Sequence, residues 1–434
     1  MRSEVLKTLS WLQIVRLGLV QTCLGAIVVL TTSTLNRLMV VELALPAILP
    51  GALVALHYGI QITRPNWGFL SDTGGQRSRW IIGGMLALAL GAVLAAYGVV
   101  ILEQTFWLGL GLSVVAYALI GLGVGASGTS LLALLATATA ERRRPAAATI
   151  TWLMMIAGIA GTAGVVGAML DPYSAGLLMR IVAVTCATAV GVTILAVWGI
   201  ERGVIARPNP DAMPFREGMA EIWNEPHARH FTLFVFLSMV AYFMQELILE
   251  PYAGLVFAFT PGQSTSLSGA QNGGVFLGMV LVGVLATGLR IGSLRNWVIA
   301  GCLGSAAALT LICALGQIGP NAPLVPAVVA LGFFNGIFAV AAIGSMMALA
   351  GQGRGSREGT RMGLWGAAQA IAAGFGGLVG AAMVDVLRSA TGVDATAFGA
   401  VFLFEAGLFL ISAYVAMRVM GRRPSPDGAL VPGE

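Results

Sequence analysis

Long apolar stretches alternate with short polar segments along the whole chain of 434 residues. A helix needs about 20 apolar residues to cross roughly 30 Å of hydrocarbon. Twelve stretches approach or exceed that length, at residues 14–36, 45–63, 80–101, 107–138, 148–169, 176–200, 230–255, 272–289, 297–316, 323–350, 362–386 and 398–420. With 57% apolar and only 10% charged residues, the chain cannot cover a globular surface. The pattern predicts an all-α integral membrane protein with twelve transmembrane helices.

The basic residues predict how these helices are oriented, because cytoplasmic loops carry an excess of Lys and Arg. If both termini lie in the cytoplasm, 21 of the 24 basic residues fall on that side, and only Arg37, Arg180 and Arg388 fall on the other. The loops that contain Glu103 and Asp394 then face away from the cytoplasm. Since the basic residues are scattered through short loops, they indicate membrane topology and no nucleic-acid partner.

The two halves of the chain carry a related pattern. Residues Ser130–Ala136 precede the basic stretch Glu141–Pro145, and Ser345–Ala350 precede a second basic stretch, Arg354–Arg361. Two six-helix halves related by an axis along the membrane normal form the major facilitator fold. We therefore predict two pseudo-symmetric six-helix bundles, at residues 1–200 and 230–420. A cytoplasmic linker at 201–229 joins them, and a cytoplasmic tail follows at 421–434.

A glycine-containing turn follows the second predicted span and resembles a loop typical of the major facilitator superfamily, G-x-L-a-D-r-x-G-r followed by Arg or Lys. It matches at Gly68, Leu70, Asp72, Gly75 and Arg77, and it differs at Thr73 and Gln76, where the superfamily usually has Arg. The glycines permit a tight turn, and Asp72 can face a helix N-terminus or an arginine. We interpret Gly68, Asp72, Gly75 and Arg77 as a conformational latch; the alternative is a plain turn whose charges set topology.

The run from Ser33 to Gln61 places an Arg, a Glu, a His and a Gln in and around apolar, membrane-spanning sequence, where polar groups are costly. Together with the turn that follows, it resembles the bacteriochlorophyll-delivery family of the major facilitator superfamily. The resemblance implies an assembly factor that binds or delivers bacteriochlorophyll to light-harvesting antenna polypeptides. It also implies a bacterial inner membrane, the intracytoplasmic photosynthetic membrane, as the location, and the reaction centre or pigment-synthesis enzymes as further candidate partners.

His57 and Gln61 lie one turn apart on one face of the second predicted span. A neutral imidazole is a good axial ligand for a metal with an open position, including the magnesium of a chlorin. His57, oriented by Gln61, is therefore a candidate pigment ligand. The alternative is a histidine that is hydrogen-bonded to a neighbouring helix. No other residue pattern in the predicted spans resembles a metal site.

Arg37 and Glu42 bracket the end of the first predicted span. Paired with each other, they would close one side of a path between the two halves. The alternative is that both side chains extend separately to the membrane interface.

Three carboxylates lie at or near membrane depth, namely Glu246, Glu250 and Glu405. Titratable acids inside the membrane are typical of proton-coupled carriers, so these residues are candidates for proton coupling. Gln245 beside Glu246 allows the alternative of a neutral hydrogen-bonded cluster. They support a second functional hypothesis, a proton-coupled secondary transporter of a small solute.

Several functional classes lack any sequence signal. The chain has no GxxxxGK[ST] loop, so we expect no use of ATP, and it has neither a nucleophile triad nor paired catalytic carboxylates, so we expect no enzyme. Its four cysteines are isolated in apolar segments, which argues against a disulfide framework.

Overall fold

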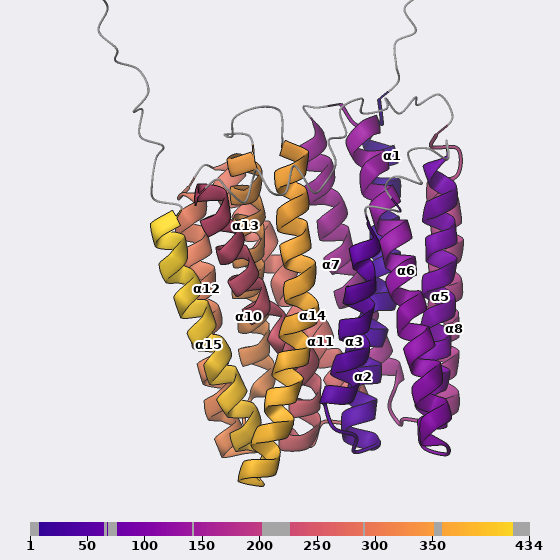
Figure 1. Cartoon of the computed structure of the whole chain (residues 1–434), viewed down its shortest axis with the longest axis vertical. Coiled ribbons are helices and arrows are strands. Elements are labelled where there is room, and N and C mark those ends of the chain that lie inside the picture. Colours follow the sequence, from indigo (N-terminus) through magenta and orange to yellow (C-terminus); the bar gives the residue numbers. More distant parts are fainter. Residues whose placement is uncertain are drawn as a thin grey trace, which may run out of the picture.

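The computed structural model describes residues 8–64, 67, 76–140, 143–201, 226–289, 291–350 and 358–419. Within these ranges the chain is helical between short connections (Figure 1). Eleven helices are long and apolar enough to cross a membrane, and the shorter apolar helix Ile48–Thr63 adds a twelfth segment. The described residues therefore agree with the predicted all-α fold and its twelve spans.

Each half of the chain forms its own helical bundle. The first half contains α1 (Trp11–Val29), α2 (Leu35–Arg37), α3 (Ile48–Ile60), α5 (Arg77–Leu102), α6 (Phe106–Ala138), α7 (Arg144–Met169) and α8 (Ala175–Val197). The second half contains α10 (Pro226–Phe257), α11 (Pro261–Val282), α12 (Leu294–Ile318), α13 (Leu324–Ala350), α14 (Glu358–Thr391) and α15 (Asp394–Val419). Each bundle buries a separate hydrophobic core, with Leu247 reaching into the first core and Ile156 into the second.

The first membrane segment continues beyond residue 36, where the sequence pattern predicted its end, to Glu42. Two π-helical turns, Leu30–Thr34 and Leu38–Glu42, flank the short α2. Wide turns of this kind are rare and often occur at functional sites. They extend the segment so that Arg37 lies inside the protein, and only 2% of its surface is exposed.

The predicted span 272–289 began too late, because α11 starts at Pro261. Thr260 and Gln263 form a reciprocal cap at this start, with bonds of 3.2 Å and 2.9 Å between each side chain and the other residue's backbone N–H. Proline suits the first helical position. Hydropathy missed these first turns of the helix, about three at 3.6 residues each, because the residues from 261 to 271 are largely Gln, Ser and Thr.

Helix α10 also begins before the predicted position 230, at Pro226, inside the range assigned to the linker. Residues 202–225 of that linker and the tail at 421–434 lie outside the described residues. The division into linker and tail therefore stays a prediction.

The two halves meet along two seams, α7 with α11 and α3 with α14. Both seams need glycine. A Cβ atom on Gly269 of α11 would lie 2.8 Å from the backbone nitrogen of Gly164, and one on Gly51 of α3 would lie 3.0 Å from the Cβ of Ala381. Both distances are shorter than an ordinary carbon contact, so larger residues would push the halves apart.

Helix α1 begins and α15 ends at the upper end of the bundle in Figure 1. The connections α2–α3, α7–α8 and α10–α11 lie at the opposite end, which we call the lower end. Two arginines that the positive-inside rule assigns to this end have acidic partners. Arg37 pairs with Glu42, and Arg388 pairs with Asp394 at 2.6 Å.

We predict that the lower end faces away from the cytoplasm. Reporter fusions after Glu103, Asp171 and Asp394 should show activity typical of the non-cytoplasmic side, because basic residues are retained in the cytoplasm. A fusion within residues 202–225 should behave as cytoplasmic. Non-cytoplasmic activity at that linker would reverse the whole topology.

Candidate functional site

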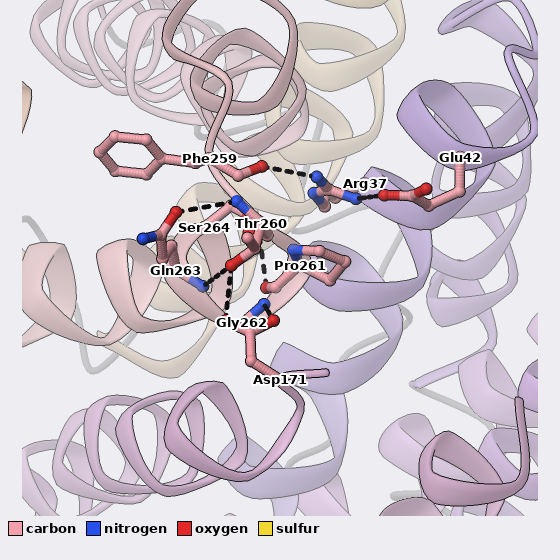
Figure 2. Close-up of polar contacts among 9 residues, drawn as sticks. All are labelled: Arg37, Glu42, Asp171, Phe259, Thr260, Pro261, Gly262, Gln263 and Ser264. Carbon is pink, nitrogen blue, oxygen red and sulfur yellow. Dashed lines mark hydrogen bonds and ion pairs between the residues drawn. The ribbon is translucent and has the colours of Figure 1, made fainter. Parts of the chain in front are cut away.

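Arg37 links the two halves at the lower end (Figure 2). Its Nη1 atom lies 2.5 Å from Oε1 of Glu42, and its Nη2 atom donates to the carbonyl oxygen of Phe259 at 2.8 Å. Phe259 belongs to the α10–α11 connection of the second half. Glu42 is 40% exposed while Arg37 is buried, so the pair reaches from the protein interior to its rim. The predicted ion pair is present, whereas its role as a gate stays a prediction.

The polar residues just before Arg37 continue this contact between the halves. Ser33 Oγ lies 3.3 Å from Ser268 Oγ, and Thr34 Oγ1 lies 3.4 Å from Thr265 Oγ1. Asn36 donates through Nδ2 to the carbonyl oxygen of Leu247 at 2.7 Å. All these groups are removed from water, where polar side chains need partners within the protein. They form a polar contact zone between the end of the first membrane segment and helices α10 and α11.

Sequence reasoning missed this polar contact zone. A signal was present in the run of small polar residues at 31–34 inside an apolar span, and in the serine-rich start of α11. Neither stretch could be paired with the other from sequence alone, since more than half of the chain's length separates them.

His57 and Gln61 contact each other, as the sequence spacing predicted. The Nε2 atoms of the two side chains are 2.9 Å apart, and the Oε1 atom of Gln61 accepts a hydrogen bond from Arg64 Nη2. Because arginine can only donate, it fixes the Gln61 amide so that its NH₂ group faces His57. The Nε2 atom of His57 is then the acceptor, and its Nδ1 atom carries the proton.

This arrangement does not suit direct pigment ligation. Both ring nitrogens are occupied, one by the Gln61 donor and the other by its own proton, and His57 is only 2% exposed. Its Nδ1 atom has no hydrogen-bond partner among the described residues. A magnesium ion would need Gln61 to move away from Nε2 first. The predicted alternative, a hydrogen bond from His57 to a neighbouring helix, is not seen among the described residues either, because its partner Gln61 follows one turn later in the same segment.

The three candidate carboxylates occupy different environments. Glu250 is buried in α10, with the hydroxyls of Ser33 and Ser268 and the guanidinium of Arg37 as its polar neighbours. Glu246 lies a turn earlier, near the rings of Tyr58 and Tyr242.

Glu405 is fully buried in α15, within the second bundle. Neither Glu250 nor Glu405 has a hydrogen-bond partner for its carboxylate oxygens among the described residues. Glu250 is thus placed between the halves, whereas Glu405 belongs to the interior of one half.

Of the predicted latch, Gly68, Asp72 and Gly75 lie outside the described residues. Arg77 is described and is buried at the start of α5. Its backbone N–H and that of Ser78 donate to the two carboxylate oxygens of Glu201, at 2.9 Å and 3.0 Å. Glu201 therefore caps α5, a role that the sequence did not indicate. The latch itself stays a prediction.

No three His, Cys, Asp or Glu side chains in the described ranges gather closely enough to hold a metal ion.

A family profile described as "PUCC protein" matches residues 34–423. The chain belongs to the PucC family. It is 67% identical over 418 residues to the "Bacteriochlorophyll synthase 44.5 kDa chain" of Rhodobacter capsulatus, covering 96% of this chain and 97% of that protein. It is 27% identical to "Protein PucC" of Cereibacter sphaeroides, covering 94% of this chain and 92% of that protein. The family resemblance predicted from the sequence is confirmed.

Solved structures of transporters share the fold of this PucC-family chain. A peptide transporter, POT, in complex with alafosfalin superposes with a TM-score of 0.68 at 16% identity, covering 94% of each chain. The nucleoside transporter NupG superposes with a TM-score of 0.68 at 16% identity, covering 94% of this chain and 99% of the other. The fold is therefore the predicted major facilitator fold, and at such low identity the likeness extends to the fold alone.

We predict that Arg37 stabilises the contact between the halves of this PucC-family protein. Arg37→Ala should lower the free energy of unfolding by about 2 kcal/mol, since hydrogen bonds to charged groups contribute on that order. Glu42→Gln should cost less than about 1 kcal/mol because Glu42 is partly exposed. Thermal unfolding in one detergent would measure both, and equal stability of Arg37→Ala and the unaltered protein would contradict the prediction.

Proposed function

We propose that this chain is a photosynthetic antenna assembly factor that binds or delivers bacteriochlorophyll to light-harvesting polypeptides in the membrane. The observation that carries the proposal is the match to the PucC family over residues 34–423. The name of the 67% identical relative from Rhodobacter capsulatus also connects that protein with bacteriochlorophyll. The proposed location is the intracytoplasmic photosynthetic membrane.

The polar contact zone supports a client that is largely apolar. Ser33, Thr34 and Asn36 are hydrogen-bonded to partners in the second half, and Arg37 is bonded to Glu42 and Phe259. Most of their polar atoms are therefore engaged within the protein, although Asn36 Oδ1 and Arg37 Nε have no partner among the described residues, and this leaves little for a hydrophilic solute to bind. A large ring with a hydrocarbon tail is better suited to the apolar surfaces of such a chain.

We further infer that the chain acts beside pigment-synthesis enzymes and is not itself one. The name of the Rhodobacter capsulatus relative points the other way, because it describes that protein as a chain of a synthase. A membrane protein that hands over pigment would be expected to associate with the enzymes that make it. Such an association would reconcile the name with a non-catalytic role. Antenna polypeptides and the reaction centre are the other proposed partners.

Purification in mild detergent from phototrophically grown cells would test the proposed function. The protein would carry an affinity tag, and we expect bacteriochlorophyll absorption and antenna polypeptides in the purified fraction. A parallel purification from cells whose protein lacks the tag should yield neither. Folded protein that repeatedly lacks both pigment and antenna polypeptides would reject the assembly role.

A pair of variants separates pigment ligation by His57 from a structural role. If the imidazole binds magnesium, His57→Leu should lower pigment per polypeptide by at least about fivefold, a change expected from losing about 1 kcal/mol. Gln61→Leu should not lower this ratio, because it frees the Nε2 atom. If His57 is structural, both variants should reduce the amount of folded protein at an unchanged ratio. The absorption spectrum of equal amounts of purified protein gives the ratio.

The position of Glu250 favours one alternative function, a proton-coupled secondary transporter of a small solute. This buried acid lies between the halves, where a change in its charge would affect their separation. Glu405 provides a matched control because it is a buried acid inside one half. Under this alternative, Glu250→Gln should abolish proton-driven uptake in vesicles while Glu405→Gln retains it. Equal effects of the two variants would remove the reason for assigning coupling to Glu250.

A further inference from the structure

Two aspartates bind helix starts across the seams at the lower end. Asp385 of α14 accepts hydrogen bonds from the backbone N–H groups of Ala47 and Ile48 at the start of α3, at 3.0 Å and 2.7 Å. Asp171, just after α7, accepts from Gly262 N at 3.1 Å and from Thr260 Oγ1 at 2.5 Å at the start of α11 (Figure 2). Each half thus caps a helix of the other half.

Both caps follow from simple helix chemistry. The first N–H groups of a helix lack partners within it, and its positive N-terminal end attracts a carboxylate. The residue before α3 is Ala47, whose side chain cannot cap the helix. Asp385 of the second half therefore provides the capping carboxylate that the residue at position 47 cannot provide.

The two caps occupy equivalent positions in the internal repeat. The difference in residue number is 214 for the two acids, 385 minus 171, and it is also 214 for the two amide donors, 262 minus 48. The position equivalent to Ala47 is then Pro261, which has no N–H to donate. At that cap the hydroxyl of Thr260 donates to Asp171 instead. The two caps are thus equivalent, except that the Thr260 hydroxyl replaces the backbone N–H donor that Pro261 lacks.

From this geometry we propose that Asp171 and Asp385 form a reciprocal double latch that holds the lower ends of the two halves together. A separation of the halves at the lower end would break both caps. Each half thus provides one cap and receives the other. The latch is a property of the fold and does not depend on the proposed assembly function.

Accessibility of a cysteine at Ser268 would test this double latch. Ser268 of α11 is 4% exposed and faces Ser33 of the first membrane segment in the polar contact zone, so a thiol there reports separation of the halves. The partly exposed Cys313 would be replaced by Ala in every variant, and the three buried native cysteines give a background measured without Ser268→Cys. The labelling rate with a charged maleimide would be measured on purified full-length protein.

We expect Asp171→Asn and Asp385→Asn each to raise the labelling rate about fivefold, because the amide loses the carboxylate charge and one of the two acceptor oxygens that bind the helix start. The double variant should raise it about 25-fold, because both caps oppose the same separation. The decisive variant is Asp385→Asn, since Asp385 lies at the other seam, where it binds the start of α3. Asp394→Asn is the control, because it removes an acid at the same end that pairs with Arg388 of its own half.

Acceleration by Asp171→Asn alone would show local fraying of α11 and would overturn the double latch. Unchanged rates in all variants would overturn it as well. If Asp385→Asn does not yield folded protein by size-exclusion chromatography, Asp385→Glu keeps the charge but displaces the carboxylate by one methylene. That variant should also speed labelling, though less, and an unchanged rate in the folded Glu variant would equally reject the proposal.

Discussion

The absence of water at membrane depth governs this structure, since every polar group there needs a partner within the protein. Arg37 shows the consequence most directly. Its guanidinium is buried at the end of the first membrane segment and is bonded both to Glu42 of its own half and to the Phe259 carbonyl of the other. The first N–H groups of α3 have no partner within that helix, and Asp385 of the other half accepts their hydrogen bonds. The polar needs of one half are therefore met by the other half, and this ties the lower ends together.

The seams combine this polar requirement with close packing. Gly51 and Gly269 allow the helices of opposite halves to approach until backbone meets backbone or a methyl group. Close approach brings the capping aspartates and the hydroxyl pairs within bonding distance. Because a typical hydrogen bond contributes only about 1 kcal/mol net, the lower end is held by several modest contacts that a rigid-body movement would break together.

The sequence predicted the elements that depend on local or compositional signals. Hydropathy identified the twelve spans, and the Ser33–Gln61 run with its following turn identified the family. The His57–Gln61 contact also followed from spacing within one helix. The sequence could not show that Arg64 orients the Gln61 amide. This orientation places a donor against the Nε2 acceptor of His57 and argues against pigment ligation in this conformation.

Contacts between segments that are distant in the sequence were also not predicted. The start of α11 was missed because its buried residues are Ser, Thr and Gln, whose burial depends on partners in the first half. The caps by Asp171 and Asp385 were missed although the chain contained a signal for them. The two acids, and likewise the two amide donors, are separated by the offset of the internal duplication. Aligning the two halves would therefore have placed Asp171 and Asp385 at equivalent positions.

The polar character of the lower end also bears on how the fold is used. Two halves that never separate are best joined by apolar surface, as in permanent interfaces, whereas contacts that form and break are commonly more polar. Here the lower end of the seams carries an ion pair, paired hydroxyls and two carboxylate caps. Such contacts are satisfied within the protein when the halves are together, and water can replace them when the halves part because the lower end reaches the rim of the protein, where Glu42 is 40% exposed. This composition favours a lower end that opens and closes.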